Sequence, residues 1–289
     1  MLKKLLFSLA FFVTLTSAYA QVEIGVNFKR NRLLQFEKIK TSLVLVNNSG
    51  SKLSFAADDK KSGMSFDIFR VDGTQRTRLK TFKKQKGFNP VGGLVLAAGE
   101  TRHLSVNLNS YYPMSTVGEY EIVAKVKHMR IPGRTFRTKP QFIKVEEGFV
   151  LETRSFGVRD AENGKVSSRK YDIQTFSKLE GDVYTLKIYD DKWVYSLSRL
   201  GPKVLGIPLK HEVDAFSNIH VLIQLKPKIF RHMLFNSRGK LRQSKFYKAS
   251  FENVPTLTRD LNVGKVSISG GFPAVEGKDY QVDFIDDEI

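Results

Sequence analysis

The residues best suited to chemistry in this 289-residue chain are three histidines that lie within one short stretch. His211, His220 and His232 occur close to two acidic residues, Glu212 and Asp214. Imidazole and carboxylate groups are common zinc ligands, and the same groups act as general acids and bases. The stretch therefore raises the question of a metal site or a catalytic centre.

The way in which two strands pair decides whether these histidines meet. If Leu225 lies opposite Ile229 across a loop at 226–228, His220 and His232 become diagonal neighbours on one sheet face, about 7–8 Å apart. That is close enough to share a metal, with a third ligand from the preceding segment. However, the spacing of the two histidines matches no recognised zinc motif, and the residues beside them are apolar. We therefore expect a hairpin that carries histidines, with no catalytic, cofactor-binding or metal-binding residue.

Other motifs give weaker indications of chemistry. Ser-x-x-Lys sequences begin at Ser49 and Ser167, but the Lys-Thr-Gly partner and the helix start that penicillin-binding enzymes need are missing. The segment 160–164 lacks the closing Glu of a calcium loop, and the pairs Asp58-Asp59 and Asp190-Asp191 suit turns. Carboxylate pairs for glycoside hydrolysis are arranged in space rather than in sequence. A hydrolase with its site in loops of the second half therefore stays an alternative, as does a metal-binding accessory protein.

Two basic runs, each without an acidic residue, form the candidate binding site. The first lies between Thr74 and Asn89, and the second lies between Lys125 and Lys139. Strand alternation places the first three cations of the first run on one face. Solvated faces, or edge strands protected by lysine, are the alternative interpretation. The predicted anion-binding residues are Arg76, Arg78, Lys80, Lys83, Lys84, Lys86, Arg130, Arg134 and Arg137.

The N-terminal residues 1–20 predict a signal peptide. Lys3 and Lys4 precede the apolar run Leu5 to Val13, and Ala18-Tyr19-Ala20 fits the small-x-small cleavage rule, which leaves Gln21 as the first mature residue. No later apolar run is long enough to span a bilayer, so we expect no transmembrane segment after cleavage. The predicted location is outside the cytoplasm: the periplasm, the cell surface or the medium.

Composition restricts the partners. The chain has no cysteine, so it can form no disulfide and must depend on its hydrophobic core. Its formal net charge is +18, and removal of two leader lysines leaves +16. A basic exported protein meets acidic polymers of the envelope rather than nucleic acid. The expected partner is therefore an anionic envelope polymer or another exported protein, with no cofactor.

Apolar and polar residues alternate with a period of two along most of the chain, which predicts strands. Examples are Val22 to Phe28, Ile39 to Val46, Met64 to Ile68 and Tyr120 to Val126. No segment shows the pattern of an amphipathic helix of about 12 residues or more. The predicted fold class is all-β.

The stretch from Leu96 to Val126 reads as turn, strand, crossover, and then Gly118-x-Tyr120 at the start of another strand. A tyrosine at the start of the penultimate strand of a Greek-key sandwich can hydrogen-bond back across the corner. Residues 22–145 resemble an immunoglobulin-like or fibronectin-III-like sandwich, without the cysteines and buried tryptophan of antibody domains. The resemblance implies an antiparallel scaffold and no particular function.

A boundary is predicted at Glu146-Glu147-Gly148, between an immunoglobulin-like domain (21–147) and a second domain (148–289). The second domain reads as an antiparallel β-meander, and its segment 214–247 resembles a propeller blade. It is too short for a full propeller of at least four blades. The layout resembles two-domain β proteins exported by bacteria, which supply no activity to carry over. We expect a non-catalytic exported protein with a binding or structural role at the envelope or outside the cell.

Overall fold

The computed structural model of the protein describes residues 22–55, 62–82, 88–131, 134–159, 164–178 and 181–281. Over these ranges the chain is all-β with several antiparallel sheets, which confirms the predicted class, and it has a short 3-10 turn at Leu108–Ser110. Within these ranges no helix is long and apolar enough to cross a membrane. The predicted signal peptide, Asp58-Asp59 and the acidic residues of 160–163 lie outside the described residues, as do Lys83, Lys84 and Lys86.

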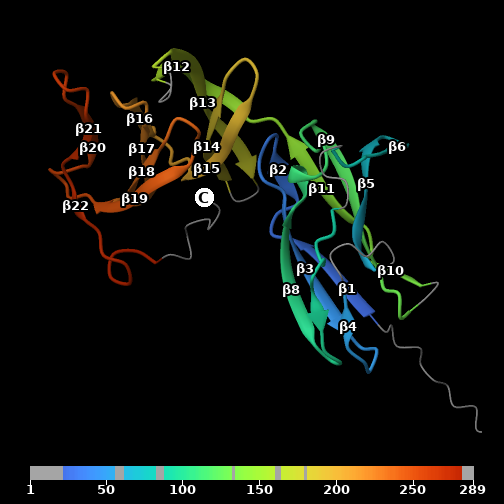
Figure 1. Ribbon diagram of the computed structural model, residues 1–289. Helices are drawn as coiled ribbons and strands as arrows, with labels where there is room; N and C mark the ends of the chain where they lie inside the picture. The colour runs from blue at the N-terminus through green and yellow to red at the C-terminus, as the bar shows by residue number, and fades with distance from the viewer. Residues whose placement is uncertain are drawn as a thin grey trace, which may run out of the picture.

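The first half of the chain contributes two sheets and a small strand pair (Figure 1). One sheet has the order β1 (Val22–Phe28), β3 (Lys40–Asn47), β8 (Thr101–Asn107). The other has the order β2 (Arg32–Leu34), β11 (Gln141–Glu146), β9 (Gly118–Lys127), β5 (Gly63–Asp72), β6 (Gln75–Arg78), with β10 (Thr135–Arg137) also paired to β9. The pair joins β4 (Leu53–Ser54) to β7 (Val95–Leu96). All these pairings are antiparallel except that of β2 with β11.

These two sheets share one hydrophobic core. On β9 the residues Tyr120, Ile122, Ala124 and Val126 are buried, while the residues between them face outward. The same core contains Leu43 of β3, from the other sheet. Strict alternation therefore gives each of these strands one buried and one outer face, as the period-two pattern predicts.

The second half contributes two main sheets whose strands follow the order of the chain. The first comprises β12 (Phe149–Arg159), β13 (Val166–Lys178), β14 (Gly181–Tyr189) and β15 (Val194–Pro202). The second comprises β16 (Lys210–Val213), β17 (Ile219–Lys226), β18 (Ile229–Phe235), β19 (Leu241–Lys248) and β22 (Phe272–Pro273). A hairpin of β20 (Thr256–Arg259) and β21 (Val266–Ser269) lies beside the second of these sheets, next to β16 (Figure 1).

Strand β17 is buried on both of its faces. Val221 and Ile223 belong to the core shared with the β12–β15 sheet. Leu222, which points the other way, belongs to a cluster with Leu257 and Ile268 of the β20–β21 hairpin. This two-sided burial explains why the apolar residues Val221, Leu222 and Ile223 of β17 are consecutive rather than alternating with polar ones.

Candidate functional site

The histidine hairpin has the predicted register. His220 lies opposite Leu234 and His232 lies opposite Leu222, so the two rings are diagonal neighbours on one face. Their centroids are 5.2 Å apart at an interplanar angle of 19°, and His220 Nδ1 is 3.1 Å from His232 Nε2. Both histidines are buried.

The turn of this hairpin differs from the expected one. Ile229 pairs with Lys226 rather than with Leu225, because the register shifts by one residue between Gln224 and Lys226. Lys228 turns the chain with a positive φ of 65°. The bulge compensates for the shorter turn, and the pairing of the histidines is therefore unchanged.

A carboxylate binds the outer nitrogen of the histidine pair. Asp214 Oδ2 lies 3.3 Å from His220 Nε2. Because a carboxylate only accepts, His220 Nε2 donates to it. Burial, with smaller contributions from the charges of His220 and Lys245, lowers the pKa of His232 to about 4. The chain Asp214–His220–His232 is thus a buried polar network with uncharged His232 at its end.

This geometry does not assemble a metal-binding set. Asp214 contacts the nitrogen of His220 that points away from His232, so the carboxylate cannot join the two facing nitrogens. His211 pairs with Val221, on the opposite sheet face from His220. Among the described residues no group of three or more His, Asp or Glu side chains could hold a metal ion.

His211 is part of a separate network. Its Nε2 lies 3.0 Å from Glu152 Oε2 and its Nδ1 lies 2.8 Å from the hydroxyl of Tyr171. Burial is the main cause that lowers the pKa of His211 and raises the pKa of Tyr171 to about 12. The neutral ring therefore donates to the carboxylate and accepts from the tyrosine, and neither nitrogen is free to take a proton from a substrate.

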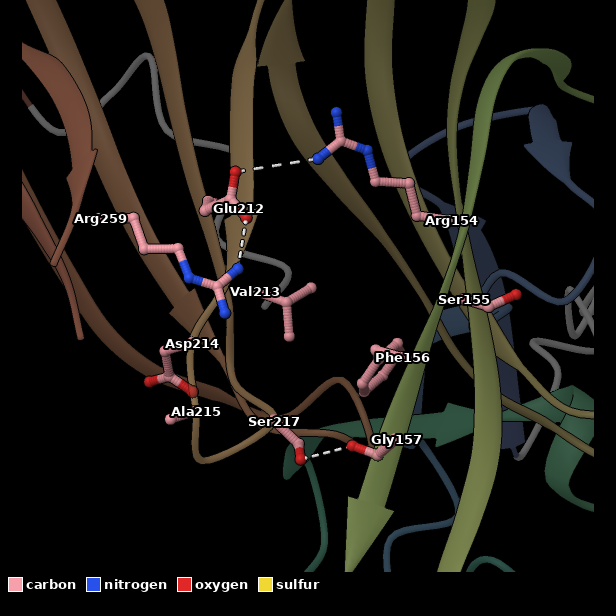
Figure 2. A pocket seen from close by; sticks show the side chains of 10 residues that line it. All are labelled: Arg154, Ser155, Phe156, Gly157, Glu212, Val213, Asp214, Ala215, Ser217 and Arg259. Carbon is pink, nitrogen blue, oxygen red and sulfur yellow. Dashed lines mark hydrogen bonds and ion pairs between the residues drawn. The ribbon is translucent and has the colours of Figure 1, made fainter. Parts of the chain in front are cut away.

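A notch of about 310 Å³ opens between β12 and the segment that includes β16 and the turn after it. Figure 2 shows Arg154 and Arg259 pointing toward Glu212 from opposite sides. The arginine Nη1 atoms lie 3.8 and 3.2 Å from the Glu212 carboxylate, respectively. Phe156 and Val213 lie between these two ion pairs and the lower end of the notch.

The polar groups of the notch are already engaged. Asp214 accepts hydrogen bonds from the backbone of Phe216 and Asn218, and Ser217 Oγ donates to the carbonyl of Gly157 at 2.6 Å. Arg154 Nε also binds Glu152, at 2.5 Å. Within the described part of the chain, the notch therefore presents neither a free carboxylate pair nor a Ser–His pair, and it gives no support to a hydrolase.

The remaining sequence motifs lie in turns or strands. Ser49 Oγ donates to Asn47 Oδ1 at 2.6 Å, in the turn that follows β3. Ser167 is part of β13. Asp190 accepts from the backbone of Lys192 and Trp193, which closes the β14–β15 turn as the sequence predicts.

Both basic runs contribute to the same six-stranded sheet. β6 carries Arg76 and Arg78, and β10 carries Arg137, with β5 and β9 between them. Each of the three arginines is paired across the sheet with a residue of β5 or β9. Along their own strands, these paired residues alternate with buried positions such as Ile68 and Ala124. Alternation therefore places all three on the outer face of the sheet, which we call the basic face.

Two acidic residues offset part of the charge of the basic face. Asp67 contacts Arg78 Nη2 at 2.5 Å and Lys125 Nζ at 2.7 Å, and Glu121 contacts Arg76 at 2.6 Å. Burial by itself raises the pKa of Asp67, but the two cations outweigh burial and lower the pKa. Asp67 is therefore held ionised between cations from both basic runs.

Of the other predicted anion-binding residues, Lys80 follows β6 and Arg134 precedes β10. Lys80, Arg134 and Arg137 are exposed, and none has an ion-pair partner among the residues that the structure describes. Arg130 Nη1 donates to the carbonyl of Lys52 at 2.9 Å. The basic face thus combines two paired arginines with exposed cations that have no acidic partner in the described ranges.

Comparison with known proteins adds no assignment. No protein-family model matches this chain, and no curated protein matches it in sequence. Function is therefore argued from the sites themselves.

Proposed function

We propose that the protein is exported and non-catalytic, and that it binds an anionic polymer of the cell envelope through the basic face. The observation that carries this proposal is the convergence of both basic runs on one sheet face, with Arg76, Arg78 and Arg137 pointing outward. The charges of neighbouring side chains add their fields at a shared surface. The signal-peptide pattern at residues 1–20 supports a location where acidic polysaccharides and lipid phosphates are the available polyanions.

We further propose that residues 21–147 form an immunoglobulin-like sandwich and that residues 148–289 form a second domain. Tyr120 is fully buried and donates its hydroxyl hydrogen bond to the carbonyl of Thr116 at 2.5 Å, which supports a tyrosine corner. The sharing of one core by two sheets also supports a sandwich. Strand β11 ends at Glu146 and β12 begins at Phe149, which supports a boundary between them.

Binding of this kind depends on salt. Exposed ion pairs contribute little individually, so affinity comes from several cations acting together along a polymer. The Debye length falls from about 10 Å at 0.1 M salt to about 3 Å at 1 M, which screens such a surface. We therefore expect retention on an anionic polymer at low salt and release as salt rises.

The test is a salt gradient on an anionic polysaccharide resin. The variant changes Arg76, Arg78, Lys80, Arg134 and Arg137 to Gln, and it should elute at clearly lower salt than the parent protein. The matched control removes the same number of positive charges from exposed positions of the second half: Arg159, Lys192, Arg242, Lys265 and Lys278 to Gln. It should elute close to the parent. Equal shifts in the two variants would mean that only total charge matters, and the basic face would lose its role.

A further inference from the structure

The junction between the two halves contains a cleft of about 710 Å³. Its first wall comes from the loop after β2 and from the 3-10 turn at Leu108–Ser110. Its second wall comes from β15 and from the turn between β18 and β19. The volume falls within the range of about 300–1,000 Å³ that is typical of small-ligand sites.

The rim of this cleft is strongly cationic. Among the described residues its one acidic lining residue is Glu37, whose carboxylate is already bound by Arg199 at 2.6 and 2.8 Å. The exposed cations of the rim have no acidic partner among the described residues, and a carboxylated ligand could pair with them. They are Lys38, Lys40, Arg238 and Lys240.

Inside the rim, three buried polar atoms have no hydrogen-bond partner in the described part of the chain: Arg199 Nη1, Ser196 Oγ and Asn107 Oδ1. All three residues line the cleft, and Arg199 is only 5% exposed. Buried polar groups are normally satisfied, so three unsatisfied ones around one cavity indicate a missing partner. The set includes a cationic donor, a hydroxyl that can donate or accept, and an amide acceptor.

The walls of the cleft are held in place by unusual backbone geometry. Gly239 has a φ of 77°, and a Cβ there would lie 1.6 Å from Ser196 Oγ, so only glycine lets the turn approach β15 this closely. Phe36 adopts a φ of 70°, which is rare for an aromatic residue, and Lys187 Nζ lies 5.2 Å from its ring centroid. Strained backbone of this kind concentrates at functional sites.

We propose that this cleft binds an oligosaccharide that carries carboxylate groups. The rim cations match the carboxylates, and the unsatisfied donors and acceptor match sugar hydroxyls, which both donate and accept. A lone small anion would fill little of the volume, and a neutral sugar would leave the rim cations unpaired. The site is separate from the basic face, and its binding does not depend on the function proposed for that face.

The first experiment is titration calorimetry of the mature protein with a tetramer of galacturonic acid. Neutral maltotetraose and inorganic phosphate serve as comparison ligands. We expect binding of the acidic tetramer, with at least roughly tenfold weaker binding of the other two, which corresponds to about 1.4 kcal/mol. Absence of binding by the acidic tetramer would overturn the proposal, and so would comparable affinity for either comparison ligand.

Variants then locate the site. The double variant Lys38→Gln/Lys240→Gln should bind the tetramer about tenfold more weakly, or weaker still. Lys192→Gln/Lys265→Gln removes the same charge away from the cleft and should leave affinity unchanged. Ser196→Ala is the sharper test, because the Oγ of Ser196 has no hydrogen-bond partner among the residues that the structure describes. Its melting temperature should stay at the parent value while its affinity falls. Unchanged affinity in Ser196→Ala and in the cleft lysine pair would exclude this cleft.

Discussion

Arg199 and Glu37 form a two-hydrogen-bond ion pair across 162 positions of the chain, and this pair joins β15 to the loop after β2. Arg199 Nε lies 2.6 Å from Glu37 Oε1, and Arg199 Nη2 lies 2.8 Å from Oε2. The carboxylate also accepts from the backbone of Leu34 at 2.7 Å. The two side chains are 3% and 6% exposed, so each charge relies on the other rather than on water.

Removal of one partner of this pair should be strongly destabilising. Glu37→Ala leaves the guanidinium of Arg199 buried without its carboxylate, and breaking a buried pair in this way costs about 3–5 kcal/mol. Urea unfolding followed by circular dichroism measures the loss. Glu23→Ala, at an exposed position of β1, is the control and should change stability little. Joint replacement, Glu37→Leu/Arg199→Met, should recover much of the loss. If Glu37→Ala matched the control, the pair would not connect the halves energetically.

Two substitutions of Tyr120 measure separately how much the packing of its ring and its hydroxyl hydrogen bond stabilise the first half. Tyr120→Ala removes a fully buried ring and should lower the free energy of unfolding by about 3–5 kcal/mol. Tyr120→Phe keeps the ring and loses only the bond to Thr116, so a loss of about 1 kcal/mol is expected. Phe142→Ala, at a 59% exposed position on β11, is the control for loss of an aromatic ring. Thermal melting of the four proteins checks the order, and a Tyr120→Ala protein as stable as the parent would contradict it.

Gly239 tests whether the β18–β19 turn is fixed by contact or only by backbone angle. Gly239→Ala introduces a Cβ that would lie 1.6 Å from Ser196 Oγ, whereas Gly50→Ala has a similar φ of 69° and meets nothing within 4 Å. Both variants lose the backbone freedom of glycine. We therefore expect Gly239→Ala to melt well below Gly50→Ala. Equal melting temperatures would show that the turn moves to accept the methyl group.

The sequence predicts a strand and its buried side most reliably where apolar residues alternate with polar ones and only one face of the strand is buried. The alternation around Tyr120 gave the correct strand and the buried side of β9. The histidine register also emerged correctly although the turn was wrong, because the bulge at Leu225 cancelled the error.

Strand β13 shows why other parts were missed. It is a central strand that pairs with both β12 and β14, and Asp172 and Gln174 on it are buried. These polar residues make its sequence look like that of an exposed segment. Asp172 accepts from Thr153 at 2.8 Å and from Tyr189 at 3.0 Å. These partners come from neighbouring strands, so no local pattern reveals that a polar strand is central.

The cleft at the junction could not be found from sequence for a related reason. Arg199 and Ser196 on β15 meet Asn107 and Glu37 only after both halves have folded and come together. The basic runs were visible because their residues are close in sequence. However, sequence alone did not reveal the acidic residue Asp67 between them.

Metal removal should leave the protein unchanged. Within the described ranges, the facing nitrogens of His220 and His232 have no third ligand beside them, since Asp214 contacts the far nitrogen. Dialysis against EDTA and then against metal-free buffer should therefore leave the melting temperature at its starting value. Added zinc should raise the melting temperature of the parent protein by no more than it raises the melting temperature of His232→Gln. Stoichiometric zinc in the purified protein, lost together with stability on chelation, would contradict this expectation.

His232 should make stability depend on pH on the acid side. Its folded pKa of about 4 lies below the ordinary value of 6.5. As the pH falls below 6.5, the unfolded chain binds a proton that the folded protein does not, so stability decreases until the pH reaches about 4 and then levels off. The full loss is about 3 kcal/mol.

The charged and titratable groups that face His232 support this assignment. His220 and Lys245 add positive charge that opposes protonation of His232. Burial raises the pKa of Asp214, but its hydrogen bonds, chiefly those from Asn218, outweigh burial and lower the pKa below 3.8. Stability that comes from Asp214 is therefore lost only at pH values below the window in which His232 acts.

Urea unfolding at pH 7 and at pH 5 measures the effect. His232→Gln keeps a side-chain amide that can hydrogen-bond to His220 but cannot take up the proton, so its stability should fall less between the two pH values than that of the parent. His103→Gln, at an exposed position, is the control and should follow the parent. If the parent and His232→Gln lose the same stability, or if the imidazole of His232 titrates near 6.5 by NMR, burial does not suppress its protonation.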